Sequence, residues 1–450
     1  MEENSNINSE NNMTQSTDID EKRNERRKRR VRNQFLAYLT IGAFVVVLIS
    51  LVIVSVYYIN QRGKVESVID TSVSDNIVDI IGTEESLVKP DETSMVQELS
   101  PQEKLDEIIN AAIQVMPIED KVAGLFMVTP ESITKVSTAV QAGNGTRDAL
   151  STWAVGGIIY FKQNMKSAEQ LTEMISNTSL YSRYPLFIGV DEEGGQVSRV
   201  AEAGLAENPG SAASIGQSGD PANAYQTGQN MASYLKNLGF NLDLAPVADI
   251  NNIADSIIGD RSYGSDSSVV SSMVASMVQG LEENGISACL KHFPGIGNSV
   301  EDTHNGMAGT ERTAEQFRAE EFLSFKAGID AGADFVMVSH LSVPAFTGDN
   351  TPCTLSKTVV TDILRDELGY NGIVITDAMN MSAITEYYEA DEAAILALKA
   401  GCDMLLMPDD FEKAYNGVLQ AVLSGTISEE RINDSLRRIY RVKYADKLAE

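Results

Sequence analysis

The sequence predicts an α/β fold, a (β/α)₈ TIM barrel preceded by an N-terminal transmembrane helix and a flexible stalk. After residue 101, short apolar runs rich in Val, Ile and Leu alternate with amphipathic, Ala-rich stretches, which is typical of βα units with a buried parallel sheet. Eight such runs occur, and eight parallel strands with crossover helices close a barrel. An uncharged apolar segment, residues 35–59, precedes them.

The N-terminal part of the chain predicts a membrane anchor. Residues 1–34 form a polar tail that we expect to be disordered and cytoplasmic, and EKRNERRKRRVR places cations directly before the apolar segment. Residues 35–59 exceed the about 20 residues that a helix needs to cross a ~30 Å hydrocarbon layer. A cleaved signal peptide would have a shorter apolar region and a small-residue cleavage site, and neither occurs here.

Cationic flanks stay cytoplasmic, so we expect a single-pass protein of the cell membrane with its catalytic domain extracellular. Residues 60–100 are acidic and rich in Ser and Thr, which is typical of an extracellular linker. Residues 101–450 are predicted to be the barrel.

The predicted strands of residues 101–450 are eight apolar runs. They are GLFMV (124–128), GGIIYF (156–161), PLFIGV (185–190), LDLAPVADI (242–250), SACLKHF (287–293), DFVMVSH (334–340), GIVITDA (372–378) and CDMLLMP (402–408). An open doubly wound sheet is the alternative fold. It would need a Gly-rich phosphate-binding turn after its first strand, but the sequence there is MVTPESI, which contains no glycine. The chain closes on an amphipathic segment, SEERINDSLRRIYRVKYADKLAE, predicted to be a helix.

Composition excludes several classes of function. With 35 Lys and Arg against 64 Asp and Glu, the formal net charge is −29, which argues against a nucleic-acid partner. The three cysteines are far apart and outside any CxxC pattern, so we expect buried, free thiols. Neither HxH, HExxH nor a dinucleotide fingerprint occurs, so we expect no metal and no cofactor. Nothing in the sequence indicates a protein partner.

Polar residues gather just past the predicted strands, where a barrel places its active site. Because those ends meet at one face, we expect these side chains to share one pocket. The candidates are, in chain order, Asp191, Arg199, Asp249, Arg261, Lys291, His292, Asp302, His304 and Asp377.

The EDTHNG loop predicts a group that can transfer protons. Asp302 lies two residues before His304, so its carboxylate can hold one ring nitrogen while the other faces a substrate. The alternative is a surface loop in which Asp302 makes only an Asx turn. Asp377, in VITDA, directly follows the apolar part of its predicted strand and is a candidate nucleophile or base. His340 is expected to line the pocket or support it from behind.

Simpler structural interpretations exist for the other candidates. Asp191 could cap a helix beside a tight Gly-Gly turn, and Lys291 with His292 could be a buried-edge pair. A nucleophilic Asp, a His–Asp pair and a ring of Asp, Arg, Lys and His able to hydrogen-bond many hydroxyls together predict a sugar site.

Five motifs, DEEGGQVSR, GDRSYG, KHFPGIGN, the EDTH loop and ITDAMNM, stand in the order found in glycoside hydrolase family 3. From about Pro117 to the C-terminal helix, the chain resembles the β-N-acetylhexosaminidase branch of that family. The resemblance implies a (β/α)₈ barrel and a retaining double-displacement mechanism, with Asp377 as nucleophile and His304 with Asp302 as acid/base dyad. The β-glucosidase branch uses instead a carboxylate from a second domain.

By the same resemblance, a set of side chains would bind the N-acetylglucosamine unit: Asp191, Arg199, Arg261, Lys291 and His292. Two positions depart from the family pattern. Ile296 stands where KHFPGHG has its second His, and Ala378 stands where a second Asp is common. We expect altered subsite detail from the first and altered positioning of the strand-seven loop from the second.

The expected function is that of a membrane-anchored exo-β-N-acetylglucosaminidase acting on extracellular amino-sugar glycans, with peptidoglycan fragments as the expected substrate. Two alternatives stay open. An imidazole acid/base would let phosphate replace water, which would make the protein a phosphorylase. A non-catalytic cell-wall sugar-binding protein could keep the barrel, although it would have no need to retain Asp377, Asp302 and His304 together.

Overall fold

The computed structural model describes residues 100–445. These residues belong to the second of two units of the chain, residues 97–450. Within them no helix is both long enough and apolar enough to cross a membrane. The predicted tail, transmembrane helix and linker, residues 1–99, lie outside the described residues and stay predictions.

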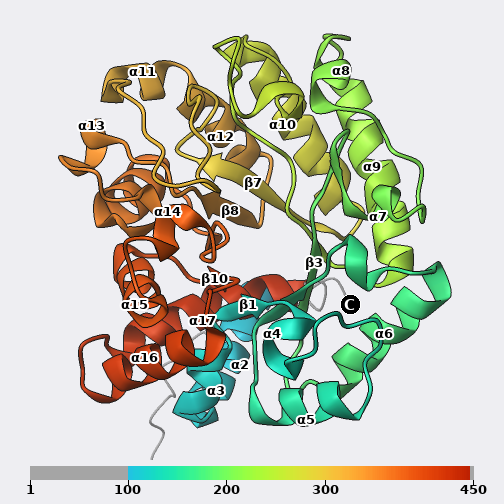
Figure 1. The fold of residues 1–450 in the computed structure, drawn as a ribbon, viewed down its shortest axis with the longest axis vertical. Helices are drawn as coiled ribbons and strands as arrows, with labels where there is room; N and C mark the ends of the chain where they lie inside the picture. The colour runs from blue at the N-terminus through green and yellow to red at the C-terminus, as the bar shows by residue number, and fades with distance from the viewer. Residues whose placement is uncertain (1–99, 446–450) are drawn as a thin grey trace, which may run out of the picture. The chain divides into compact units, whose positions relative to one another are not determined.

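Eight parallel strands form the centre of the described domain, and helices surround them (Figure 1). The neighbours in the sheet follow the order β10-β1-β2-β3-β6-β7-β8-β9. The strand bounds are β1 Phe126–Val128, β2 Gly157–Ile159, β3 Phe187–Val190, β6 Leu242–Asp243, β7 Ser287–Phe293, β8 Phe335–Val338, β9 Ile373–Thr376 and β10 Leu405–Leu406. Each predicted run contains one strand, so the eight-strand prediction is confirmed.

The ring of strands is nearly closed. Strand β1 pairs with both β2 and β10, so the first and last strands are neighbours. A parallel bridge between Ile375 and Met404 brings β9 beside the segment that leads into β10. The architecture is therefore that of a TIM barrel, and an open doubly wound sheet is excluded because its first and last strands would not pair.

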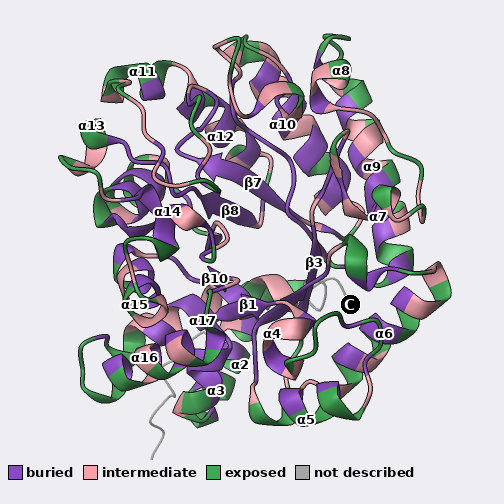
Figure 2. Ribbon diagram, in the orientation of Figure 1, coloured by how far each residue is buried: buried purple, intermediate pink, exposed green. Residues whose placement is uncertain are grey.

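Helices connect consecutive strands and expose their polar faces to solvent, while the strands are buried (Figure 2). The helices before β6 are α2 Pro101–Val115, α3 Ile118–Ala123, α4 Pro130–Thr134, α5 Asn144–Thr152, η1 Lys162–Asn164, α6 Ala168–Tyr181, α7 Arg199–Glu202, α8 Ala212–Gly216 and α9 Pro221–Leu238. Those after β6 are η2 Gly259–Arg261, α10 Ser267–Glu282, α11 Ala314–Ala319, α12 Glu321–Asp330, α13 Pro344–Thr347, η3 Cys353–Leu355, η4 Thr358–Glu367, α14 Ser382–Thr385, α15 Ala390–Ala400, α16 Phe411–Leu423 and α17 Glu429–Lys443.

Helix α10 illustrates how the sequence produces this layer. Asp266 caps it, because its side chain accepts the N–H groups of Ser268 and Val269. Its apolar residues recur every three or four positions, so they form one stripe on the helix surface. The buried residues of that stripe are Val270, Met273, Val274, Met277, Val278 and Leu281.

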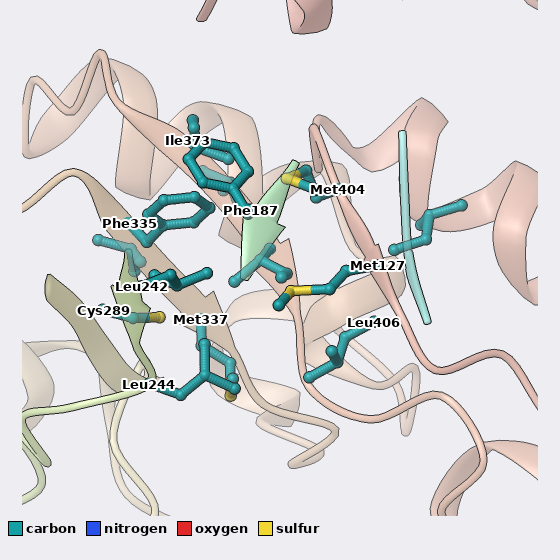
Figure 3. Packing of buried hydrophobic residues seen from close by; sticks show 14 of the residues in the cluster. Met127, Phe187, Leu242, Leu244, Cys289, Phe335, Met337, Ile373, Met404 and Leu406 are labelled. Atoms are coloured by element: carbon teal, nitrogen blue, oxygen red, sulfur yellow. The ribbon is translucent and has the colours of Figure 1, made fainter. Parts of the chain in front are cut away.

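Interdigitated apolar side chains fill the barrel, so it has no open channel (Figure 3). The Phe187 and Phe335 rings meet edge to face there, with their centroids 4.9 Å apart. Gly189 leaves room for Met127, since a Cβ at that glycine would lie 2.3 Å from the Met127 methyl carbon. Cys289, Cys353 and Cys402 are buried and free, as predicted.

A small antiparallel hairpin, β4 (Glu192–Gly194) with β5 (Val197–Ser198), follows β3 and was not predicted. Its turn needs the DEEGG sequence, because Gly194 and Gly195 have φ values of 90° and 62°. The C-terminal helix α17 packs beside α2. There Arg441 donates to the Asp106 carboxylate at 2.6 and 3.0 Å, and Arg437 donates to Asn110 at 2.7 Å.

Candidate functional site

A cavity of about 320 Å³ opens at the carboxyl ends of the barrel strands. Eight of the nine candidates that the sequence predicts for the pocket line it: Asp191, Arg199, Arg261, Lys291, His292, Asp302, His304 and Asp377. The ninth, Asp249, is fully buried and does not line it. Its floor includes Leu244, Met337 and Leu406, which belong to the apolar filling of the barrel (Figure 3). The cavity is therefore closed from below.

Lys291 lies near the carboxyl end of β7, between two carboxylates. Its Nζ lies 2.7 Å from Asp191 Oδ1 and 2.6 Å from Glu193 Oε1, and its side chain is only 3% exposed. Burial disfavours the ammonium, but the two carboxylates outweigh this effect and raise the pKa of Lys291. Lys291 is therefore a fixed cation at the cavity wall.

Glu193 is a site residue that sequence reasoning missed. Besides Lys291, it holds Arg261 in a two-point contact, with Nε and Nη2 of Arg261 each 2.8 Å from a Glu193 oxygen. Burial opposes ionisation, but Lys291 and Arg261 prevail and lower the pKa of Glu193 to about 2. Successive side chains of a strand point to opposite faces. Had the β4–β5 hairpin been predicted, this rule would have indicated that Glu192 and Glu193 lie on opposite faces of it.

His292 is held by Asp249 from behind. The ring Nδ1 lies 2.8 Å from Asp249 Oδ2, which also accepts the His292 backbone N–H at 3.1 Å. The other ring nitrogen, Nε2, lies 3.3 Å from Arg261 Nη2. Asp249 is 0% exposed, and its second oxygen accepts the Ile296 N–H at 2.7 Å. Asp249 thus orients the ring and fixes the turn after β7.

Asp377 follows β9 and lies at the edge of the cavity, partly buried. Its Oδ1 accepts the N–H of Ala378 at 2.8 Å. Burial raises the pKa of the Asp377 carboxyl, but the His292 and His340 rings, the Ala378 amide and Lys291 together lower it below its usual value. Asp377 is therefore an ionised carboxylate in a partly apolar pocket, as a nucleophile needs to be.

His340 lies behind Asp377. It is 0% exposed, with Nδ1 2.8 Å from Thr354 Oγ1 and Nε2 3.0 Å from the Ala378 carbonyl oxygen. Burial lowers the pKa of the His340 ring and favours its neutral form. His340 was predicted either to line the pocket or to lie behind it, and the geometry agrees with the second position.

Asp302 and His304 lie on the loop between β7 and α11. Asp302 Oδ1 accepts the His304 backbone N–H at 2.9 Å and lies 2.7 Å from Nδ1 of the ring. The Asx turn and the His–Asp pair were alternative interpretations, and both are present. Burial raises the pKa of Asp302, but the His304 amide and ring hydrogen bonds outweigh it and lower the pKa. Between them, the Thr303 carbonyl accepts the Ala383 N–H at 3.1 Å, which ties the loop to α14.

Arg199 is less firmly held than the other cations of the cavity. Its only ion pair in the described residues is to Glu202, with Nη1 3.5 Å from Oε1.

Ile296 lines the cavity and is 6% exposed, so an apolar surface stands where the family pattern has an imidazole. In residues 100–445 no group of three or more His, Cys, Asp or Glu side chains has an arrangement that could hold a metal ion.

Comparison with known proteins gives consistent matches. The model of the glycosyl hydrolase family 3 N-terminal domain matches residues 117–442. The beta-hexosaminidase of Idiomarina loihiensis is 35% identical over 292 residues, which are 64% of this chain and 87% of that protein.

Two solved structures are similar in fold. A glycoside hydrolase family 3 beta-N-acetylglucosaminidase from Paenibacillus superposes with a TM-score of 0.69 at 33% identity, over 75% of this chain and 64% of that chain. A beta-N-acetylhexosaminidase from Beutenbergia cavernae superposes with a TM-score of 0.65 at 27% identity, over 73% of this chain and 98% of that chain. The chain thus spans less than two thirds of the Paenibacillus enzyme but nearly all of the Beutenbergia enzyme.

Proposed function

The chain belongs to glycosyl hydrolase family 3 and is a glycoside hydrolase, and from this premise we propose that it is a retaining exo-β-N-acetylglucosaminidase. The resemblance seen in its five motifs is thereby confirmed at the level of the family. The observation that carries the proposal is that one cavity holds an ionised carboxylate, Asp377, and an imidazole oriented by a carboxylate, His304 with Asp302.

In the proposed mechanism Asp377 attacks the anomeric carbon and forms an ester with the sugar. His304 gives its Nε2 proton to the departing glycosidic oxygen, so the aglycone leaves as an alcohol. The hydrogen bond from Nδ1 to Asp302 leaves Nε2 free to face the substrate. His304 then removes a proton from water, which attacks the anomeric carbon and releases the sugar and Asp377.

The other charged groups suit recognition of sugar hydroxyls. Lys291 and Arg261 are neutralised by Asp191 and Glu193, so they can donate hydrogen bonds without presenting a net positive charge to the sugar. We assign sugar binding to the five residues predicted for it: Asp191, Arg199, Arg261, Lys291 and His292.

Exo action is supported by the shape of the cavity. A glycan chain cannot run through it, because buried barrel residues form its floor. We propose that a sugar enters by a chain end and that the aglycone stays on the side of His304, whose side chain is 70% exposed.

The site of action is a further part of the proposal. The cation-flanked apolar segment, residues 35–59, supports a single-pass anchor with residues 1–34 in the cytoplasm and the barrel outside the cell. An extracellular hexosaminidase at a membrane has peptidoglycan fragments as a fitting amino-sugar substrate. Protease added to intact cells should remove the barrel and leave residues 1–34 protected. Full protection of the barrel would contradict this orientation.

The activity is tested with nitrophenyl β-glycosides of N-acetylglucosamine, glucose and xylose and the full-length protein. We expect the N-acetylglucosaminide to be hydrolysed with the highest kcat/KM, at a rate that does not depend on added phosphate. A sugar phosphate as main product would establish the phosphorylase. No release from any substrate, with the sugar still bound, would establish a sugar-binding protein.

A further inference from the structure

The side of hairpin β4–β5 that faces away from the cavity is anchored by Glu192. Successive strand residues point to opposite faces, so Glu192 points away while Asp191 and Glu193 face the sugar site. Glu192 is 0% exposed. Its carboxylate accepts the Val200 N–H at 2.7 Å, a second N–H of α7 at 3.2 Å and the Tyr234 hydroxyl at 3.0 Å. Glu192 therefore ties the hairpin to α7 and α9.

A second buried carboxyl, Asp243, lies beside Glu192. Leu242 and Leu244 point into the barrel (Figure 3), so Asp243, between them, points outward toward the helix layer. Asp243 is 0% exposed, and its Oδ1 accepts the Glu192 backbone N–H at 3.0 Å. Its Oδ2 is buried without a hydrogen-bond partner among residues 100–445, and no cation there forms an ion pair with it.

Only one of these two carboxyls has the surroundings of an anion. Burial raises the pKa of Glu192 too, but three hydrogen bonds to its carboxylate oppose this effect. Asp243 accepts only one hydrogen bond. A buried carboxylate without a cation or enough donors is strongly disfavoured, so the proton belongs on Asp243.

The charged surroundings agree with this assignment. Burial raises the pKa of Asp243 well above its usual value, and Glu192 and Asp191 raise it further against the opposing effects of the Glu192 N–H and Lys291. The titratable groups around the Asp243 carboxyl are Asp191, Glu192, Tyr234, Tyr263, Cys289 and Lys291.

We propose that Asp243 is a positioning residue that keeps a proton in the folded protein where an exposed aspartate would have lost it and, in that form, holds the backbone of hairpin β4–β5 in the place where Asp191 and Glu193 meet Lys291. Its effect on the sugar rests on the proposed function, whereas the protonated state does not.

The proton gives a signature that an ordinary structural residue lacks. Because the pKa of Asp243 is raised in the folded state, the folded protein binds one more proton than the unfolded protein above pH 3.8. Stability therefore falls as pH rises from there toward the folded pKa. An amide at this position keeps the shape and the acceptor for Glu192 N–H and takes up no proton. Its NH2 group finds no acceptor where Oδ2 lies, and this cost does not depend on pH.

The first experiment compares the melting temperature of the full-length protein and two variants between pH 5 and pH 8. The Tm of Asp243→Asn relative to the wild type should rise by about 2–4 °C between pH 5 and pH 8, because only the wild type has to keep a proton on this side chain as pH rises. The matched control is Asp403→Asn, another fully buried aspartate, which has Arg365, Arg431 and Arg438 as partners. The control should lower Tm at every pH. A Tm difference between Asp243→Asn and the wild type that is independent of pH, or that falls as pH rises, overturns the proton assignment.

The second experiment tests positioning. Asp243→Asn should keep kcat and KM within twofold of the wild type, whereas Asp243→Leu, which cannot accept the Glu192 N–H, should raise KM about tenfold with a smaller change in kcat. An unchanged KM in folded Asp243→Leu overturns the positioning role. If the wild-type protein hydrolyses no glycoside, the proposed function has failed, and the Tm measurements still decide where the proton lies.

Discussion

His304 and Asp302 contact each other on the loop between β7 and α11, with Nδ1 and Oδ1 2.7 Å apart, while the His304 side chain stays 70% exposed. The imidazole is thus fixed at one nitrogen and open to solvent and substrate at the other. This arrangement suits a proton donor that must first meet an aglycone and later meet water.

Replacing His304 should therefore affect substrates according to their leaving group. His304→Ala should lower kcat/KM for a disaccharide by about 10²–10⁴-fold, because its departing alkoxide needs a proton. Cleavage of a dinitrophenyl glycoside should be affected far less. Asp302→Asn should give a milder form of the pattern, and Glu301→Gln, an exposed change on the same loop, is the matched control. Equal losses on both substrates would show a binding role instead.

Asp377 should be required for every substrate. Asp377→Ala removes the group that attacks the anomeric carbon, so even an activated leaving group should not be released. A 2-fluoro glycoside should label Asp377 in the wild-type protein, and mass spectrometry of peptides locates the label. Labelling of Asp191 or Asp249 would overturn the assignment.

Removing the charge of Glu193 should weaken both binding and folding. Glu193→Gln leaves Lys291 and Arg261 without their shared carboxylate, and breaking such a buried pair lowers stability by about 3–5 kcal/mol. KM should rise because both cations lose their fixed positions. The measurements are thermal unfolding and Michaelis kinetics, with exposed Glu207→Gln as control.

Glu193 also predicts a dependence of stability on pH. Its folded pKa is lowered from 4.5 to about 2, so its contribution is present above pH 4.5 and is lost as pH falls through about 2. Acid titration of unfolding should therefore be shallower in Glu193→Gln than in the wild type. Parallel curves would contradict the ion-pair account.

A fragment that begins at Gln97 should fold and act without the preceding residues. Helix α2 starts with its own capping box, in which Ser100 accepts the Glu103 N–H at 3.3 Å and its N–H meets the Glu103 carboxylate at 2.8 Å. We expect one cooperative unfolding transition and a kcat/KM within twofold of the full chain. Aggregation or loss of activity would show that residues 1–96 contribute to folding.

The barrel was predictable because its signal is repeated and local. Eight buried apolar runs at intervals that fit one helix admit few other folds, and each run contains a strand. The site face followed from the same pattern, since Asp191, Lys291 and Asp377 each stand at a strand end. Their roles in catalysis and binding stay predictions.

The contacts between site residues that are far apart in the sequence were not predictable. Glu193 meets Arg261, which lies 68 positions later in the sequence, and nothing in DEEGG indicates which of its two glutamates faces inward. Asp249 was named beside a strand end, but its hold on His292 depends on how the loop after β7 turns. Such contacts form only once the barrel has closed in three dimensions. The periodicity of apolar residues in the sequence does not indicate which side chains then meet.

The pairing of α2 with α17 has a topological consequence. Because Arg441 and Asp106 hold the beginning and the end of the described domain side by side, the two ends are close enough to be joined by a short linker. The chain could then be opened at an exposed connection elsewhere, such as the one between α16 and α17, to give a circular permutant with the same barrel. The order in which the eight βα units are synthesised would change, while the neighbours of every strand would not.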